Sequence, residues 1–384
     1  MKQIFLIAGE ASGDTLGASL MRGLKNQGVP AANMVGIGGA LMAEEGLESL
    51  LPMDELCVMG LWEVVGQLPR LLKLINAMVE EIENRQPDIL VTIDLPDFNF
   101  QVAKRLKKRG VFKGKIIHYV APSVWAWRPG RAKKIAAYLD GLMCLFPFEP
   151  KYFEKHGLKA AYVGHPLIEL DKSAIDRTGF RENTLGIAPD TLCIGAFFGS
   201  REGEVATHMP LFLQGLDALH EQQPGFEVIA PTLPALEHEV RDALAGMPFT
   251  SHVITDPRHK WNAFASCDAA LAVSGTVGLE LAYLGVPHLI GYRAHPLTAL
   301  IVRLLIKTKF VHLGNIMLQE AVVPEYLQGK CTAQNLLLGL LRLIRQKETQ
   351  AKQQEGFARL AQTLKIEDAQ TPSARAAAFV LSLF

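Results

Sequence analysis

The sequence predicts an α/β protein of two lobes, each built around a doubly wound parallel sheet. The chain has 384 residues, which is enough for two domains of ordinary size. Short apolar runs alternate with glycine-containing turns and longer amphipathic stretches, which is typical of strand–helix units around a parallel sheet. This rhythm pauses over residues 166–189, where charges interrupt it, and then resumes. We therefore expect a first lobe over residues 1–168, a linker, and a second lobe over residues 185–350.

In the first lobe, strands are expected where short, mainly apolar runs occur. These runs cover residues 4–8, 89–93, 115–120 and 142–146. Between them lie stretches with apolar residues three and four positions apart, as amphipathic helices require, at residues 17–27, 68–85 and 100–109.

In the second lobe the same reasoning predicts strands at residues 192–197, 227–230, 252–255, 268–273 and 288–292. Residues 332–384 are expected to be helical, and we treat residues 351–384 as separate C-terminal helices.

Composition narrows the function classes. Lys plus Arg and Asp plus Glu both number 39, so no net positive charge attracts nucleic acid. The five cysteines lie far apart, which predicts neither a disulfide framework nor a zinc site and fits a reducing compartment. The first residues are too short an apolar run for a signal peptide, and no run is long enough for a spanning helix. We expect a protein that is soluble or bound to a membrane surface.

Ligands of parallel α/β sheets bind beyond the carboxyl ends of the strands, so the residues after each run are the candidates. Residues 9–14 read Gly-Glu-Ala-Ser-Gly-Asp, which suits either a ligand loop or a helix cap. Residues 94–99 read Asp-Leu-Pro-Asp-Phe-Asn, in which one carboxylate is a candidate general base or both cap the next helix. The run with His118 leads into residues 121–128, which hold two tryptophans and suggest a binding surface, although a lone buried histidine is more often a core residue.

The second lobe carries two loops suited to phosphate. Residues 199–205 follow a strand and include Arg201, whose guanidinium complements the free amides of a helix start. Residues 274–280 place Thr276 and Glu280 one helical turn apart, which fits a diphosphate at the helix start and a ribose on Glu280, or a solvated acid. No Asp-x-Asp motif is present, so we expect no metal and no cofactor.

Residues 58–75 hold more apolar side chains than one buried helix face requires, and basic residues accompany them. They predict either a membrane-interface helix or a core helix. The candidate membrane residues are Met59, Leu61, Trp62, Val65, Leu68, Leu72 and Ile75. Basic clusters at residues 104–115 and 128–134 would favour an anionic surface, or form solvated helix faces.

Taken in order, the motifs at residues 9–14, 94–99, 118–128 and 199–201, with Ser274-Gly275-Thr276 and Glu280, resemble those of the lipid-A-disaccharide synthase family over nearly the whole chain. The resemblance implies a GT-B fold, in which two Rossmann-like lobes face a cleft. It also implies an inverting glycosyltransferase that joins UDP-2,3-diacylglucosamine to 2,3-diacylglucosamine 1-phosphate, forms a β(1→6) disaccharide and releases UDP. The expected location is the cytosolic face of a Gram-negative inner membrane.

The resemblance assigns roles to individual residues. Asp97 is expected to take the proton of the acceptor hydroxyl, and Arg201 to stabilise the leaving diphosphate. Donor binding is assigned to Gly199, Ser200, Arg201, Ser274, Gly275, Thr276 and Glu280. Acceptor binding is assigned to Glu10, Ser12, Gly13, Asp14, His118, Ser123 and Asn315. The sequence departs from the family pattern at Phe198, Ala121 and His312-Leu313-Gly314.

Two other functions remain open at this level. One is a UDP-sugar epimerase of the same fold, and the other is a lipid-binding protein without catalysis. The resemblance also leaves open whether the last helices cross back to the first lobe or exchange between the subunits of a homodimer.

Overall fold

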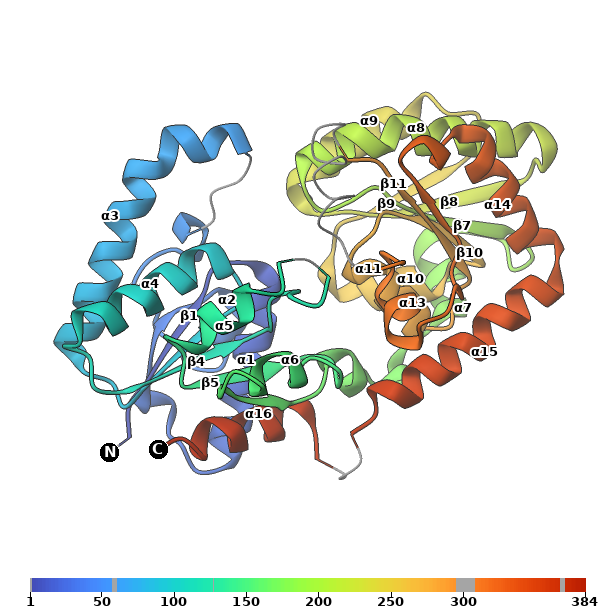
Figure 1. Cartoon of the computed structure of the whole chain (residues 1–384). Helices are drawn as coiled ribbons and strands as arrows, with labels where there is room; N and C mark the ends of the chain where they lie inside the picture. Colours follow the sequence, from blue (N-terminus) through green and yellow to red (C-terminus); the bar gives the residue numbers. More distant parts are fainter. Residues whose placement is uncertain (1, 57–60, 127, 295–307, 367–369) are drawn as a thin grey trace. The chain divides into compact units, whose positions relative to one another are not determined.

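The computed structural model describes residues 2–56, 61–126, 128–294, 308–366 and 370–384. The chain forms two compact units (Figure 1). Unit 1 comprises Met1–Glu169 together with Leu364–Phe384, and unit 2 comprises Leu170–Thr363. Among the described residues, no helix combines the length and the apolar character that crossing a bilayer requires.

Unit 1 contains a six-stranded sheet in the order β2-β1-β3-β4-β5-β6, and all its strand pairs are parallel. The strands are β1 (Ile4–Ala8), β2 (Met34–Ile37), β3 (Ile89–Ile93), β4 (Lys115–Tyr119), β5 (Gly141–Cys144) and β6 (Lys159–Tyr162). The direction of strand order reverses between β1 and β3. In open α/β sheets such a reversal opens a crevice at the carboxyl ends of the two strands, where ligands bind.

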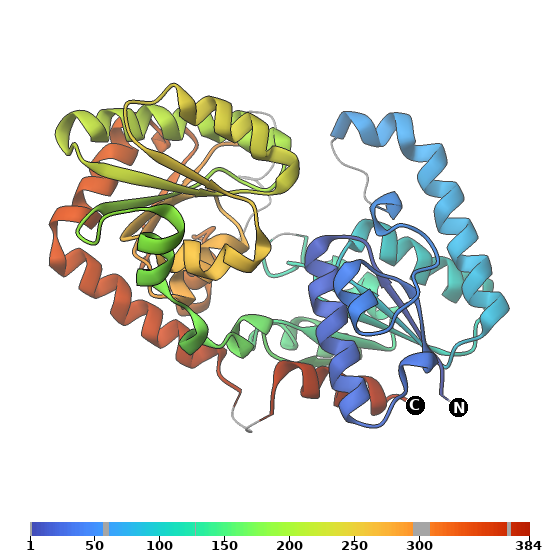
Figure 2. The same cartoon turned by 180° about the vertical axis from the view of Figure 1, so that it is seen from behind.

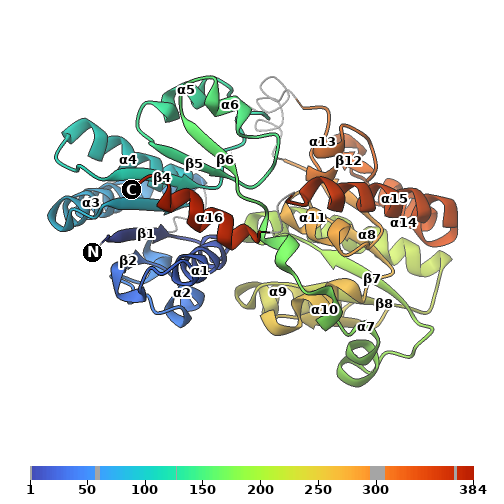
Figure 3. The same ribbon diagram turned by 90° about the horizontal axis from the view of Figure 1, so that it is seen from below.

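The helices of unit 1 cover both faces of this sheet. They are α1 (Ala11–Asn26), α2 (Ala40–Glu44), α3 (Leu61–Arg85), α4 (Pro96–Arg109), α5 (Arg131–Ala136), α6 (Lys151–Glu154) and α16 (Pro372–Leu381). Phe5 and Ile7 face the side covered by α3 and α4, where they join one buried apolar cluster. The C-terminal helix α16 packs beside α1 (Figure 2, Figure 3). Gly23 allows this approach, because a Cβ there would lie 2.2 Å from the Ser373 carbonyl oxygen.

Unit 2 contains a second six-stranded parallel sheet in the order β12-β11-β10-β7-β8-β9. The strands are β7 (Leu192–Phe197), β8 (Phe226–Pro231), β9 (Ser251–Ile254), β10 (Ala269–Ala272), β11 (His288–Tyr292) and β12 (Glu325–Leu327). Strand order reverses here between β7 and β10. The prediction of two doubly wound α/β lobes is confirmed.

The helices of unit 2 are α7 (Arg177–Gly179), α8 (Glu202–Gln222), α9 (Glu237–Ala245), α10 (Lys260–Ala265), α11 (Thr276–Tyr283), α13 (Leu313–Leu318), α14 (Ala333–Arg345) and α15 (Lys347–Leu364). Apolar faces of α8, α9 and α14 form one buried cluster with Ile194 and Ala196 of β7. Helices α10, α11 and α13 lie on the other face of the sheet (Figure 1).

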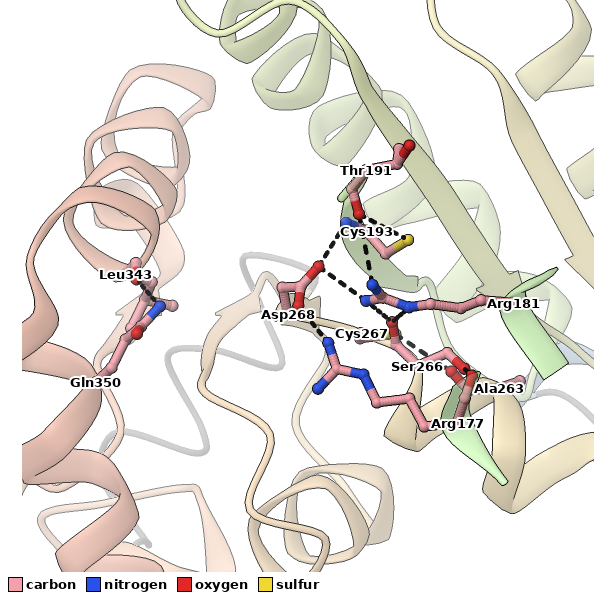
Figure 4. Close-up of polar contacts among 10 residues, drawn as sticks. All are labelled: Arg177, Arg181, Thr191, Cys193, Ala263, Ser266, Cys267, Asp268, Leu343 and Gln350. Carbon is pink, nitrogen blue, oxygen red and sulfur yellow. Dashed lines mark hydrogen bonds and ion pairs between the residues drawn. The ribbon is translucent and has the colours of Figure 1, made fainter. Parts of the chain in front are cut away.

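The charged stretch expected as a linker folds largely onto unit 2. Arg181 is buried, donates hydrogen bonds to the Ser266 carbonyl oxygen and pairs with Asp268 at 2.8 Å (Figure 4). Arg177 pairs with the other Asp268 oxygen, and the Cys193 amide donates to Asp268 at 2.8 Å. These contacts lie at the amino ends of β7 and β10. They therefore anchor the segment at the end of the sheet opposite the candidate ligand loops.

Candidate active site

In unit 1, the loops that follow β1 and β3 meet at the point where strand order reverses. The Ser12 hydroxyl donates to Asp94 Oδ2 at 2.9 Å, which joins the start of α1 to the loop after β3. Leu95 crosses directly over Gly9, where a Cβ would lie 2.4 Å from Leu95 Cδ2. A larger residue at position 9 would require the end of the Leu95 side chain to move.

The turn after β3 is strained, and it presents Asp97 to solvent. Asp94 and Leu95 have φ angles of 50° and 43°, a region that residues other than glycine rarely adopt. The buried Asn99 amide holds this turn by donating to the carbonyl oxygens of Ile93 (3.2 Å) and Asp94 (2.8 Å). Asp97 follows in the first turn of α4 with 98% of its side chain exposed. Its carboxylate is accessible to a substrate and lies at the positive end of the helix dipole.

Arg131 is a neighbour of Asp97 that the sequence indicated only as part of a basic cluster. Its Nη2 atom lies 3.7 Å from Asp97 Oδ1, and its guanidinium lies over the Phe100 ring at 5.3 Å. The sequence motif alone did not identify it as a site residue, because α5 and α4 are brought together only by the sheet.

His118 occupies the core below this surface. Its side chain is fully buried, and Nδ1 lies 2.8 Å from Thr92 Oγ1. The same Thr92 hydroxyl lies 3.2 Å from the Ile117 carbonyl oxygen, so it contacts both the imidazole and the backbone of β4. Burial, with a smaller contribution from the charge of Arg131, lowers the pKa of His118 to about 3. His118 is therefore a neutral core residue here and does not line an accessible acceptor site.

A second cluster lies at the carboxyl ends of β4 and β5. Glu149 is 2% exposed, and its two carboxylate oxygens accept hydrogen bonds from Trp125 Nε1 (3.2 Å) and the Phe146 amide (3.0 Å). The Trp125 ring also packs edge-on against Phe148 at 5.3 Å. Burial raises the pKa of Glu149 to about 8, although these hydrogen bonds act in the opposite direction. Sequence analysis singled out the tryptophans but missed the glutamate that holds Trp125.

The remaining residues assigned to the acceptor in unit 1 have different surroundings. Asp14 is buried and accepts hydrogen bonds from the amides of Gly39, Leu41 and Met42 at 2.9–3.0 Å. It therefore caps α2, which corrects its assignment to substrate binding. Gly13 is also buried, against β1 and the Ile93 carbonyl.

Besides the exposed Ser12, two further assigned acceptor residues lie at the surface. Glu10 is the partly exposed N-cap of α1, and Ser123 is exposed in the turn after β4. Their positions are compatible with contact to a ligand.

In unit 2, the loops after β7 and β10 also meet at a reversal of strand order. The strands pair directly, with Ala272 opposite Phe197, and the Val273 amide donates to the Phe197 carbonyl at 3.1 Å. Gly199 has a φ of 126°, and a Cβ there would lie 2.7 Å from Glu204 Cβ. The Glu204 carboxylate accepts from the Ser200 amide at 3.2 Å.

This contact weakens the phosphate site that the sequence predicts at the start of α8. The Glu204 carboxylate already accepts the hydrogen bond of the Ser200 amide, so its negative charge would repel a phosphate bound there. Within the described ranges, the exposed Arg201 side chain donates no hydrogen bond and forms no ion pair. Arg201 is thus the anion-binding group that this loop offers.

The start of α11 is the better anion site of the two loops. Its N-cap Gly275 provides no side-chain cap, and the space around Gly275 is open, so the first amides of the helix are accessible. The Ser274 hydroxyl donates to the Val311 carbonyl at 3.3 Å. Glu280, one turn after Thr276, pairs with Lys260 Nζ of α10 at 2.7 Å. Lys260 is a residue that sequence analysis missed, because α10 and α11 are adjacent only in the fold.

Asn315 belongs to unit 2 and is fully buried. Its amide donates to the Val323 carbonyl and to Glu325, and its oxygen accepts from the amides of Val322 and Val323, all at 2.8–2.9 Å. Every polar group of this side chain is used within the protein, so the assignment of Asn315 to acceptor binding is corrected to a structural role.

His312, where the sequence departs from the family pattern, stabilises the same segment as Asn315. His312 Nδ1 accepts from the Asn315 amide, and its Nε2 lies 3.2 Å from Nε2 of the buried His288. Burial lowers the pKa of His312 to about 4 and that of His288 to about 3, so both imidazoles are neutral. The Glu325 carboxylate holds the Val311 and His312 amides, and Val311 in turn contacts Ser274.

The candidate membrane helix is described only in part. Met59 lies outside the described residues, and the structure describes the backbone but not the side chains of Leu61, Trp62, Val65 and Leu68. Leu72 is 38% exposed. Ile75 is 1% exposed and belongs to the core of unit 1, so its assignment to a membrane surface is wrong for this structure.

Solved structures share this architecture. A UDP-GlcNAc 2-epimerase from Neisseria meningitidis, bound to UDP-GlcNAc, has a TM-score of 0.65 at 12% identity, with 100% of this chain and 99% of that chain covered. CalG4, the calicheamicin glycosyltransferase, has a TM-score of 0.60 at 15% identity, with 100% and 98% covered. The fold therefore places the chain in the two-lobed α/β class that includes glycosyltransferases and nucleotide-sugar epimerases.

Sequence relatives narrow the class. A family model described as lipid-A-disaccharide synthetase matches residues 4–379. The lipid-A-disaccharide synthase of Rhodospirillum centenum is 43% identical over 380 residues, which cover 99% of this chain and 94% of the relative. That of Paramagnetospirillum magneticum is also 43% identical over 380 residues, with 98% and 96% covered. The chain belongs to the lipid-A-disaccharide synthase family of glycosyltransferases.

Proposed function

We propose that the protein transfers 2,3-diacylglucosamine from its UDP derivative to the 6-hydroxyl of 2,3-diacylglucosamine 1-phosphate, with inversion and release of UDP. One observation carries this proposal. In each unit, polar loops lie where the strand order of the sheet reverses. The loop in unit 1 offers the Asp97 carboxylate, and the loops in unit 2 offer anion-binding groups, Arg201 and the first amides of α11. This division matches the needs of a base for an acceptor alcohol and a site for a diphosphate leaving group.

Asp97 is the proposed general base. It accepts the proton of the acceptor hydroxyl while the hydroxyl oxygen forms a bond to the anomeric carbon of the donor. Its exposure fits this role, because the carboxylate has no hydrogen bond from the described residues to give up before it meets the substrate.

Arg201 and the first amides of α11 are the proposed diphosphate site. As the bond between the anomeric carbon and UDP breaks, its electron pair leaves with UDP, and these groups stabilise the negative charge that develops. Glu280 is the proposed acceptor of hydrogen bonds from the ribose, with Lys260 holding its carboxylate in place.

Attachment to the cytosolic face of the inner membrane is the proposed location. Leu72 is exposed on α3 between Arg70 and Lys73, which are exposed as well. An apolar side chain flanked by basic ones favours an anionic lipid surface, where the acylated substrates reside.

The epimerase alternative shares the fold, and structural similarity does not separate the two activities. Membership of the synthase family over residues 4–379 favours the transferase. An epimerase needs no second sugar, and a lipid-binding protein without catalysis needs no UDP-sugar, so the acceptor requirement and UDP binding distinguish the three.

The test is UDP release by the purified protein with acylated acceptor, with deacylated acceptor and with none. We expect release only when the acylated acceptor is present. Interconversion of the UDP-sugar without an acceptor would support the epimerase instead. Lipid binding without any calorimetric signal for UDP would support the non-catalytic alternative.

A further inference from the structure

Arg131 lies beside the proposed base with hydrogen-bond donors that the protein does not use. Its side chain is 28% exposed, and its nearest charge partner is Asp97 Oδ1 at 3.7 Å, beyond hydrogen-bond distance. In the part of the chain that the structure describes, the guanidinium donates no hydrogen bond to the protein. A partly buried guanidinium has five N–H donors, so this group is suited to binding an anion.

The Arg131 guanidinium is also held in a fixed place. It lies over the Phe100 ring at 5.3 Å, and that ring packs in turn against His118 at 4.5 Å and Tyr138 at 5.9 Å. A guanidinium that packs by its face on an aromatic ring can still donate hydrogen bonds from its N–H edges. The aromatic cluster therefore orients the donors before a ligand arrives, which favours bidentate binding of a phosphate.

We propose that Arg131 binds the phosphate monoester of the acceptor sugar, an inference that rests on the proposed function. In a glucosamine 1-phosphate, the carbon that bears the phosphate and the carbon that bears the hydroxymethyl group both adjoin the ring oxygen. A sugar with its 6-hydroxyl on Asp97 thus carries its phosphate on the same edge of the ring. Because Arg131 lies directly beside Asp97, one acceptor molecule reaches both side chains.

Two other roles would use the same side chain. Arg131 would act as a positioning residue if it only oriented the Asp97 carboxylate. It would act in membrane binding if it bound the phosphodiester of a lipid headgroup, because Arg128, Lys133 and Lys134 nearby are exposed and basic. If Arg131 binds the acceptor phosphate, its effect on kcat/KM depends on whether the acceptor carries that phosphate. Neither of the other two roles has this dependence.

The experiment measures kcat/KM in micelles of neutral detergent for the acceptor with its 1-phosphate and for the same sugar with a 1-O-methyl group. The full-length wild type is compared with Arg131→Gln and with Arg131→Met, whose apolar stem maintains packing on Phe100. Lys151→Gln is the matched control, since Lys151 begins α6 as Arg131 begins α5 and lies 5.5 Å over the Tyr152 ring. Each assay is repeated with phosphatidylglycerol added.

We expect the wild type and Lys151→Gln to prefer the phosphorylated acceptor by about 10- to 100-fold, the scale of charge-assisted hydrogen bonds. Both Arg131 variants should reduce this preference to within about threefold. Equal losses on the two acceptors would assign Arg131 to positioning Asp97 and overturn the proposal. A defect that occurs only with phosphatidylglycerol would assign it to lipid headgroups and overturn it too. A wild type that transfers sugar to neither acceptor would instead refute the proposed function.

Discussion

Ser12 donates its hydroxyl to Asp94 across 2.9 Å, and this hydrogen bond joins two loops that are 82 residues apart in the chain. Ser12 lies in the first turn of α1 after β1, and Asp94 begins the strained turn after β3. The contact lies where strand order reverses in the sheet of unit 1. It fixes the turn from which Asp97 projects.

Loss of this hydrogen bond should weaken binding of the acceptor and leave binding of UDP unchanged. For Ser12→Ala we expect the KM for the acceptor to rise about 2- to 10-fold, the value of one ordinary hydrogen bond, with unchanged affinity for UDP. Steady-state kinetics and a UDP titration measure the two effects. Thr15→Ala is the matched control, because among the described residues the Thr15 hydroxyl bonds within α1 alone, to the Ala11 carbonyl. An equal effect of both substitutions would show that the contact to Asp94 has no special role.

Arg201 should matter for the leaving group. For Arg201→Ala we expect turnover to fall about 10²- to 10³-fold, the scale seen when a donor to a developing anion is removed. Arg241→Ala removes an exposed arginine of α9 that pairs with Glu237, and it should leave turnover unchanged. If Arg201→Ala releases UDP at the normal rate, the diphosphate binds elsewhere.

Glu280 should distinguish ribose from deoxyribose. Removal of the carboxylate charge in Glu280→Gln leaves Lys260 without its partner and weakens the acceptor for ribose hydroxyls. We expect wild-type protein to bind UDP about 10-fold or more tightly than 2′-deoxy-UDP, and the variant to bind the two with similar affinity. Calorimetry with both ligands measures this difference. A variant that maintains the full preference would place the ribose away from α11.

Glu149 should make stability depend on pH. Its pKa is raised to about 8 in the folded protein, so between its ordinary value and about 8 the unfolded chain loses a proton that the folded chain retains. Stability therefore falls as pH rises through this window, by at most about 1.4 kcal/mol per pH unit. Glu149→Gln removes this titration. The glutamine NH2 group would face one of the two N–H donors, which lowers stability by an amount that does not depend on pH.

The measurement is urea unfolding of wild type and Glu149→Gln at pH 5.5 and pH 8.5. The free energy of unfolding of the variant, relative to wild type, should increase with pH. A difference that stays constant over this range would mean that the Glu149 carboxyl ionises normally in the folded protein.

The strands buried on both faces were the most predictable part of the fold. Residues 4–8, 89–93, 192–197 and 288–292 coincide with β1, β3, β7 and β11, since continuous apolar runs mark such strands. The strands β2, β6 and β12 were not predicted. They lie at sheet edges, have only three or four residues, and contain intermediate or exposed positions that interrupt the apolar pattern.

The loops of the site were predictable, and the partners of each side chain were not. The rule that ligands bind after parallel strands indicated the segments that contain Ser12, Asp97, Arg201 and Glu280. It did not show that Asp14 caps α2, or that Asn315 uses all its polar groups internally, because both depend on elements distant in sequence. For the same reason, Arg131 was indicated only as part of a basic cluster and Lys260 was missed.

The most direct test of the account is UDP release by Asp97→Asn with the acylated acceptor, compared with wild type and with Glu80→Gln, an exposed acid of α3 in the same unit. We predict that Asp97→Asn lowers turnover about 10²- to 10⁴-fold, with unchanged UDP affinity, and that Glu80→Gln lowers neither. A folded Asp97→Asn protein with near-normal turnover would contradict the assignment of Asp97 as the base.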